Sequence, residues 1–323
     1  MSKETEEKLK KLFEKGYTAS SAREQLKLDI YLSDIDNYDK KSADNSIVPT
    51  VSTIQHMFNK SFGNVYGAKS GKEMDNDLDE MLKKYCEETP EGKAVFGRVG
   101  QHKYVAICTP IMARAHKLMP SAGELVLVDA SGNMDTMNHR VYILCTPGPP
   151  GGVPLGCIIT DVEKCEVFQA ALEALTSIFP EGSFYGKSCP TVILTDDDLK
   201  ERIPLQNVWK EVILLLCQFH VLKAHWGWLC ESKKKIDRQD RQRMYLGFKK
   251  ILHANNEEEL ESAYKSHVAE WAKYPHYCTY VEGKCARKRE WADAYRSDLP
   301  IRSNDTTNYV EVIFRILKDC VFE

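Results

Sequence analysis

Apolar residues follow a strand-like pattern only in the middle of the chain. Between about residue 95 and residue 217, short runs rich in β-branched residues are bounded by turn residues, which predicts a series of strands. The runs are YVAICTP, ELVLVDAS, HRVYILCTP, VPLGCIITD, TVILTDDD and EVILLLC. Before residue 90 and after residue 230, apolar residues instead recur at spacings of three and four, which predicts helices.

Helices and turns set the order of these strands. The segment VEKCEVFQAALEALTSIFP predicts one helix, with Asp161 as its N-cap and Pro180 at its end. LKERIPLQNVW and QFHVLKAHWGWL predict helices on either side of the last strand. Strands joined by a tight turn, such as TPGPPGG, should pair antiparallel, and strands joined through a helix should pair parallel. From ELVLVDAS onward, the order βββαβαβ-α predicts an α/β fold with the mixed sheet of a ribonuclease H-like domain.

The rest of the chain is expected to be helical. Two helices separated at Gly16, with a capping cluster at Thr18, form either a DNA-binding helix-turn-helix or a helical hairpin packed on the body. The polar residues 36–54 are expected to be a linker. The four expected parts are a helical N-terminal region (1–90), a ribonuclease H-like catalytic core (95–228), an all-helical insertion (229–300) and a final core helix (301–323).

Composition removes several classes of protein. The chain has 323 residues, of which 43% are hydrophobic and 28% charged, as in globular proteins. Its longest dense apolar run, Val212 to Cys217, is far too short to span a bilayer, so no membrane partner is expected. The 11 cysteines are scattered without a CxxC pair, which indicates a reducing compartment rather than a disulfide framework. The net charge of -3 means that any nucleic-acid role depends on local basic patches.

Carboxylates follow two of the expected strands. Asp129 ends the run that begins at Leu125, and Asp196 ends the run that begins at Val192. These strands are neighbours in the expected sheet, and open α/β sheets bind ligands at such strand ends. Two adjacent carboxylates repel unless a cation lies between them, and Mg²⁺ or Mn²⁺ suits oxygen ligands. With Glu311 on the final helix as a third acid, the pattern predicts a two-metal site for phosphodiester chemistry.

Each acid also has an ordinary structural explanation. The aspartates from Asp196 to Asp198 can cap the helix that follows, because acids favour helix N-termini. Glu311 can form an ion pair with Arg315, four residues later. Asp129 can simply begin a turn. The pattern alone does not separate these explanations from a metal site.

Basic residues gather in two stretches of the expected insertion. Residues 231–250 contain eight basic and three acidic side chains, and KCARKR occupies 284–289. Such patches would bind DNA phosphates without reading sequence, although a charged helix is usually a solvated face. Nearby tryptophans, Trp226 and Trp228 among them, are expected to pack the insertion rather than to stack on a base. The candidate DNA-binding residues are Lys233, Lys234, Lys235, Arg238, Arg241, Arg287, Lys288 and Arg289.

Five segments in order resemble the Mutator-like element (MULE) transposases. They are LVLVDASGNMDTMNHRVYILCTP, PLGCIITDVEKCEVFQAALEALTSIFP, TVILTDDDLKERIPLQNVW, LLLCQFHVLKAHW and TTNYVEVIFRILKD, and they cover roughly residues 100–320. The resemblance implies a DDE-type enzyme that cuts DNA at element ends and joins the freed 3′-hydroxyl to target DNA. It implies that Asp129 and Asp196 ligate both metals and that Glu311 completes the site. A nuclear protein that acts on double-stranded DNA, as a homo-oligomer when bound, is then expected.

The C-x-x-H step of the same family falls on Cys217 and His220. With two later ligands, for which His267, His276 and Cys278 are available, these residues could hold Zn²⁺, which needs four matched ligands. In the alternative, Cys217 is buried on its strand and His220 lines the rim of the site, where it contacts a scissile phosphate.

The sequence also departs from the family. Many relatives carry an N-terminal zinc module and continue into a C-terminal SWIM-type zinc finger, and neither pattern is found here. A fragment or a degenerate copy is therefore one expectation. The competing function is a domesticated, inactive module that binds DNA or protein. A generic ribonuclease H-like nuclease is disfavoured by the insertion before Glu311.

Overall fold

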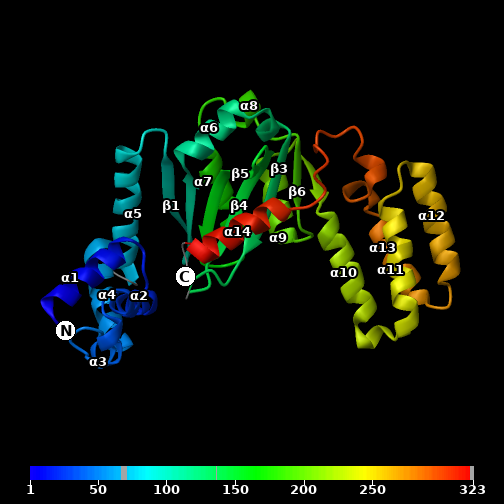
Figure 1. Ribbon diagram of the computed structural model, residues 1–323. Coiled ribbons are helices and arrows are strands. Elements are labelled where there is room, and N and C mark those ends of the chain that lie inside the picture. The colour runs from blue at the N-terminus through cyan, green and yellow to red at the C-terminus, as the bar shows by residue number, and fades with distance from the viewer. Residues whose placement is uncertain (67–70, 136, 321–323) are drawn as a thin grey trace. The chain divides into compact units, whose positions relative to one another are not determined.

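The computed structural model describes residues 1–66, 71–135 and 137–320. The chain divides into two compact units, one spanning Met1–Leu82 and the other beginning at Lys83 (Figure 1). Across the described residues, no helix is long and apolar enough to cross a membrane.

The N-terminal unit is a small helical assembly. Its core joins three helices through Leu9, Ala22 and Ile54, which are fully buried. Gly16 adopts a φ of 86°, a left-handed conformation that glycine tolerates, and the Thr18 side chain then caps the second helix. The helices are α1 (Lys3–Glu14), α2 (Ala19–Ser33), α3 (Tyr38–Ala43), α4 (Val51–Tyr66) and the start of α5 (Gly71–Glu88). The expected linker at 36–54 is therefore wrong, while the helix-turn-helix interpretation stays a prediction.

The second unit is built on a seven-stranded mixed sheet with the order β1-β2-β5-β4-β3-β6-β7. The strands are β1 (Lys93–Val99), β2 (His102–Cys108), β3 (Leu125–Ser131), β4 (Arg140–Gly148), β5 (Gly151–Thr160), β6 (Val192–Thr195) and β7 (Ile213–Leu216). The α/β class and the predicted strand runs are confirmed. Strand β1 was not expected, because charged residues such as Arg98 make its apolar pattern weak. It lies at the edge of the sheet and pairs with β2.

Pairing within the sheet follows the connections. Strands β4 and β5 form the hairpin expected around Gly148 and Gly151. Strand β6, reached through helices, pairs in parallel with β3, and β7 pairs in parallel with β6. The expected side-by-side placement of β3 and β6 is confirmed, so three parallel strands end at the same edge of the sheet.

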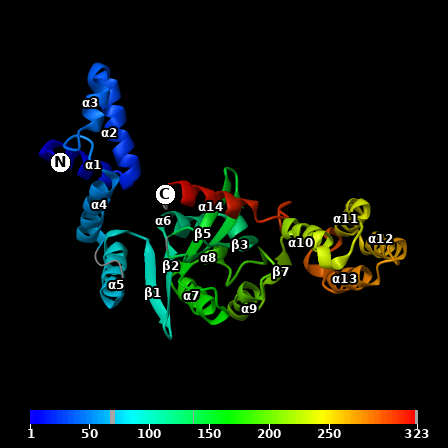
Figure 2. The same ribbon diagram turned by 90° about the horizontal axis from the view of Figure 1, so that it is seen from below.

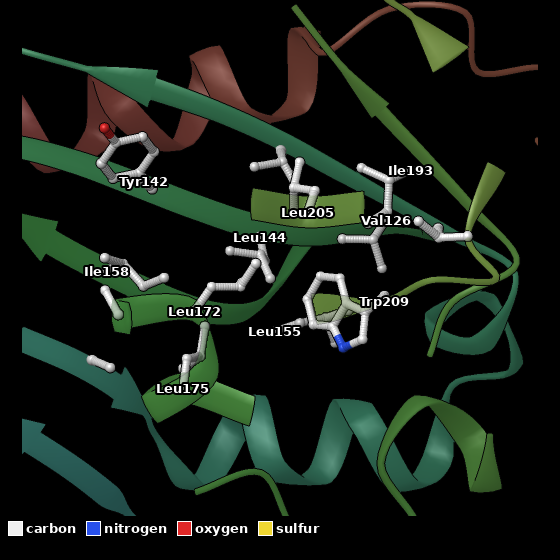
Figure 3. Close-up of a cluster of buried hydrophobic side chains, with 14 of the residues drawn as sticks. Val126, Tyr142, Leu144, Leu155, Ile158, Leu172, Leu175, Ile193, Leu205 and Trp209 are labelled. Carbon is white, nitrogen blue, oxygen red and sulfur yellow. The ribbon is translucent and has the colours of Figure 1, made fainter. Parts of the chain in front are cut away.

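Helices cover both faces of the sheet. Figure 1 shows α14 (Asn308–Cys320) across one face, and the view turned by 90° in Figure 2 shows α7 (Cys165–Ser177) and α9 (Leu199–Val208) on the other. Alternate residues of β3 contribute to the hydrophobic clusters on the two faces of the sheet, because successive side chains of a strand point to opposite faces. Val126 packs in the cluster with Leu172 and Leu205 that Figure 3 shows, whereas Leu127 packs with Phe314 of α14.

Further helices complete the second unit. The helices are α6 (Pro110–Leu118), α7 (Cys165–Ser177), α8 (Ser183–Gly186), α9 (Leu199–Val208), α10 (Gln218–Cys230), α11 (Arg238–Leu252), α12 (Glu257–Glu270), α13 (Pro275–Cys285) and α14 (Asn308–Cys320). Helix α6 was not expected. The N-cap of α7 is Lys164, and Asp161 instead donates its backbone N–H to the Lys103 carbonyl, so the Asp161 cap was wrong.

The segment from α10 to α13 has a hydrophobic core of its own. Phe248, Tyr277 and Trp291 are almost completely buried in it, and Trp271 is buried as well. Trp226 differs, since 43% of its surface is exposed. All regular structure described between residues 229 and 300 is helical, as the sequence pattern predicts.

Two buried histidines in this core predict a loss of stability in acid. His267 Nε2 lies 2.7 Å from the Tyr277 hydroxyl, which lies 3.4 Å from His225 Nε2. Burial, helped by the nearby His267 and Lys284, lowers the pKa of His225 to about 3. Burial also lowers the pKa of His267 to about 4, which Glu270 opposes. The unfolded chain therefore takes up protons first as the pH falls below about 6.5.

The free energy of unfolding is expected to fall between pH 6.5 and pH 4, by up to about 1.4 kcal/mol per pH unit for each histidine. The prediction is tested with the variant His225→Phe, which keeps an aromatic ring stacked on Phe248 but cannot take up a proton. The free energy of unfolding is measured by urea unfolding at several pH values. We expect a shallower pH slope for the variant. Exposed His56 in α4 provides the control, because His56→Gln should leave the slope unchanged. An unchanged slope in His225→Phe would contradict the prediction.

Candidate functional site

Parallel pairing brings two of the predicted acids level with each other. The register pairs Leu125 with Val192 and Leu127 with Leu194. Continued two positions past Leu127 and Leu194, the same register brings Asp129 level with Asp196, which directly follows the end of β6. Neighbouring strands lie about 4.8 Å apart, so these carboxylates belong to one site. Cys217 directly follows β7 and donates its backbone N–H to the Thr195 carbonyl. It therefore lies at the end of the strand next to β6.

The segment before α14 is tied to the same edge of the sheet. Thr307 directs its backbone N–H and its hydroxyl toward Cys217 Sγ, at 3.4 and 3.6 Å. Gln218 donates its backbone N–H to the Asp305 carbonyl. Helix α14 therefore begins beside the strand ends, and Glu311 lies in its first turn.

These elements line an open pocket of about 490 Å³, the acid pocket. Strand ends contribute Asp129 and Asp196, and α14 contributes Glu311, so the pocket joins the three acids that the sequence predicts. Arg315 and Lys318 line the same wall of α14, and sequence reasoning did not select them as site residues. The spacing 311, 315, 318 was the available signal, because it places three side chains on one helical face. The described contacts include no ion pair between Glu311 and Arg315.

The carboxylates of this pocket lie close enough to repel one another, and this repulsion affects the pKa of Asp129. Asp129 is 8% exposed and accepts a hydrogen bond from the Ala130 backbone N–H at 2.7 Å. Burial, helped by repulsion from Asp196 and Glu311, raises the pKa of Asp129 to about 7. The Ala130 bond and the nearby His220 act in the opposite direction without restoring the ordinary value. A cation in the pocket would therefore favour the charged form of Asp129 at neutral pH.

His220 lies between the acids and Cys217. Its Nδ1 contacts Asp196 Oδ1, and ligand atoms of Asp196, Cys217 and His220 lie within 4.8 Å of one another. The contacts to Asp196 and Cys217 raise the pKa of His220 to about 10. Burial alone would raise the pKa of the Cys217 thiol, but contacts with His220 and Thr307 outweigh it and lower that pKa. The Cys217–His220 pair thus adds softer ligands to an otherwise hard, oxygen-rich site.

Glu201 is a further buried acid that sequence reasoning missed. It lies in the first turn of α9, is 4% exposed, and accepts a hydrogen bond from the Thr195 hydroxyl at 3.3 Å. Burial, followed by repulsion from Asp129 and Asp196, raises the pKa of Glu201 to about 8. In the sequence it resembles an ordinary charged residue of an exposed helix, and only the fold reveals its burial.

The remaining aspartates of the triplet have separate roles. Asp198 caps α9 by accepting the Lys200 backbone N–H at 2.8 Å, as one of the alternatives expected. Asp197 is neither a cap nor simply solvated, because it accepts a hydrogen bond from Arg287 at 2.8 Å and lies 3.6 Å from the Lys284 ammonium. Burial would raise the pKa of Asp197, but Arg287 outweighs it and lowers that pKa. Asp197 therefore joins the strand end to the helical insertion.

Several predicted DNA-binding cations are engaged within the chain. Arg287 also binds Glu290, and Lys288 pairs with Glu261 and Glu257. Arg241 donates to the Ile236 carbonyl. Phosphate binding by these side chains would have to replace intramolecular contacts. DNA binding by the other candidates stays a prediction, and these are Lys233, Lys234, Lys235, Arg238 and Arg289.

The chemistry of the donor set fits a hard divalent cation. Asp129, Asp196 and Glu311 offer carboxylate oxygens in one open pocket, and Mg²⁺ and Mn²⁺ prefer such ligands. Among the described residues, the ligand atoms that lie within 4.8 Å of one another belong to Asp196, Cys217 and His220. A structural zinc site would need a fourth protein ligand beside Asp196, Cys217 and His220. The later residues considered for zinc are engaged elsewhere: His267 contacts Tyr277, His276 contacts the Lys234 carbonyl, and Cys278 points to the Val268 and Trp271 carbonyls.

Comparison with known proteins adds no family. No protein-family model matches this sequence, and no curated protein matches it.

Proposed function

We propose that this protein is a DDE-type transposase of the Mutator-like class, with a ribonuclease H-like core that cleaves and joins DNA strands with the help of divalent metal ions. The observation that carries the proposal is the meeting of Asp129, Asp196 and Glu311 in one pocket. The order of motifs, the parallel β3-β6-β7 arrangement and the helical segment before Glu311 support it. Double-stranded DNA is the proposed substrate, and the nucleus and a homo-oligomer on DNA follow from the family resemblance.

Each residue has a defined task in this proposal. Asp129, Asp196 and Glu311 would hold two Mg²⁺ or Mn²⁺ ions, which lower the pKa of a water and stabilise the leaving oxygen. In cleavage, a water oxygen would bond to phosphorus and release a proton to solvent, while the bond to the 3′-oxygen breaks and that oxygen takes up a proton from solvent as the freed hydroxyl. Asp129 must enter the reaction as a carboxylate, and Arg315 and Lys318 hold the phosphate against the acids.

A second candidate is the domesticated, inactive module that binds DNA or protein. The contact between His220 and Asp196 favours it, because a protonated imidazole supplies the acids with a cation without any metal. In this case the pocket is a structural ion-pair cluster, and metal ions would neither bind nor stabilise the protein.

Calorimetric titration with Mn²⁺, in the presence and absence of a short DNA duplex, separates the two candidates. The wild type is expected to bind Mn²⁺, and Asp129→Asn is expected to weaken binding by at least about 100-fold, since even outer-sphere changes cost 10–100-fold. Asp319→Asn, a change at the rim of the same pocket, is the matched control and should bind nearly as well. Absence of Mn²⁺ binding in the wild type, even with DNA, would reject the enzyme.

The same titration tests the softer ligands. Cys217→Ser is expected to leave Mn²⁺ binding largely intact, because Mn²⁺ prefers oxygen ligands. Zn²⁺ binding that depends on Cys217 while Mn²⁺ does not bind would instead assign the site to zinc.

A further inference from the structure

A second pocket lies at the far end of α10, away from the acids. Its volume is about 600 Å³, and it is lined by Trp228, Tyr280, His276 and three consecutive lysines, Lys233–Lys235. Helix α10 has 13 residues, so its two ends are separated by about 20 Å. The acid pocket and this lysine pocket therefore stand at opposite ends of one helix.

Aromatic contacts hold the central lysine in place. The Lys234 ammonium lies 4.8 Å from the centre of the Trp228 ring, a cation–π contact. The Trp228 ring also stacks on Tyr280, with centroids 4.5 Å apart. His276 Nε2 lies 2.7 Å from the Lys234 carbonyl, which fixes the backbone of the lysine turn. Contacts with the aromatic residues and His276 therefore restrict the position of Lys234 in the lysine pocket.

The charge of this pocket is unbalanced. Glu231 lies 3.2 Å from Lys233 and 4.0 Å from Lys234, and it is the one acid that the described ion pairs assign to the three lysines. Lys233 and Lys235 remain exposed. By contrast, Arg243 pairs with Glu270. A net positive charge therefore faces the solvent at the lysine pocket.

The geometry selects phosphates over bases as the ligand. A base needs an open aromatic face for stacking. The Trp228 ring is already engaged within the chain, because it stacks on Tyr280 and lies against the Lys234 ammonium. Lysine ammonium groups act as point charges that suit phosphate oxygens.

We infer that the lysine pocket binds the phosphate backbone of double-stranded DNA, with Lys233, Lys234 and Lys235 as the contacting residues. The inference rests on the proposed function, in which DNA is the substrate of the acid pocket. About 20 Å corresponds to about six base pairs at 3.4 Å each. A duplex that lay along α10 from the acids would therefore span about six base pairs between the two ends of the helix.

The experiment measures the salt dependence of binding to a fluorescein-labelled 20-base-pair duplex by anisotropy in EDTA, where no cleavage occurs. Lys233→Ala/Lys235→Ala is expected to weaken binding about tenfold or more and to reduce the slope of log K against log salt by about two, since each phosphate contact contributes about 0.9. Lys249→Ala/Lys250→Ala is the matched control, because both lysines are exposed at the end of α11 and do not line the pocket. It should retain the wild-type slope, and circular dichroism checks the fold of both variants.

The outcomes separate this site from the proposed function. An unchanged slope in Lys233→Ala/Lys235→Ala, an equal loss in the control variant, or no DNA binding by the wild type would overturn the inference. Binding of polyglutamate that depends on these lysines, while DNA binding does not, would overturn it in favour of an acidic polypeptide. If the slope falls as expected but the wild type never cleaves DNA with Mn²⁺, the lysine pocket stands and the proposed enzyme fails.

Discussion

Replacing Asp196 with asparagine is expected to lower Mn²⁺-dependent cleavage of duplex DNA by at least about 10³-fold, equivalent to about 4 kcal/mol of transition-state stabilisation. The carboxylate follows β6, lies opposite Asp129 and lines the acid pocket with Glu311. Asparagine keeps the shape of the side chain but removes the charge that a metal ion requires. Single-turnover cleavage of a labelled duplex is the measurement, because it follows the chemical step directly.

Asp198 offers a matched control two residues away. It is also an aspartate in the same turn, but it caps α9 through the Lys200 backbone N–H. Asp198→Asn should retain most of the cleavage activity, and its stability should change little because asparagine is also a good N-cap. Equal losses of cleavage activity in Asp196→Asn and Asp198→Asn would mean that the aspartates affect activity by stabilising helix α9 rather than by binding a metal ion. Full activity in Asp196→Asn would reject the proposed ligand.

Replacing Arg296 with alanine is expected to lower the free energy of unfolding by about 3–5 kcal/mol. Arg296 is 3% exposed. Its guanidinium donates to the Leu216 carbonyl at 2.6 Å, to the Glu290 carbonyl at 3.1 Å and to Asp305 at 3.0 Å. One side chain therefore joins the end of β7 to the insertion and to the segment that precedes α14. Its removal leaves buried acceptors and a carboxylate without their donor.

The Arg296→Ala change should also affect the site, because Asp305 lies in the segment that leads to Glu311. Urea unfolding measures the stability, and Mn²⁺ titration of the folded variant measures the site. Arg302→Ala provides the control, since Arg302 pairs with Glu124 at an exposed position and should cost no more than about 1 kcal/mol. Arg296→Lys should not restore the wild-type value, because a single ammonium cannot reproduce three directed contacts. A loss below about 1 kcal/mol in Arg296→Ala would contradict this account.

The difference between Arg296 and Arg302 illustrates what the sequence leaves undetermined. Both are arginines in a polar stretch near the end of the helical insertion, and no local pattern distinguishes them. Burial against Leu216 makes one a structural residue, while exposure leaves the other on the surface. The same holds for Glu201, whose burial beside the acids depends on how α9 packs on the sheet.

The order of the elements from β3 to β7 and the placement of Asp129 and Asp196 at neighbouring strand ends were accessible from the sequence. Continuous apolar runs specify buried strands, and helical connections force parallel pairing, so the residue after each run lies at a shared edge. Only the tertiary structure decided which cations are available. Arg287 is engaged by Asp197, 90 residues away, whereas the lysines at 233–235 face an open pocket. Local periodicity describes the neighbours along a helix or strand, but a side chain's ion-pair partner and its access to solvent depend on segments that only folding brings together.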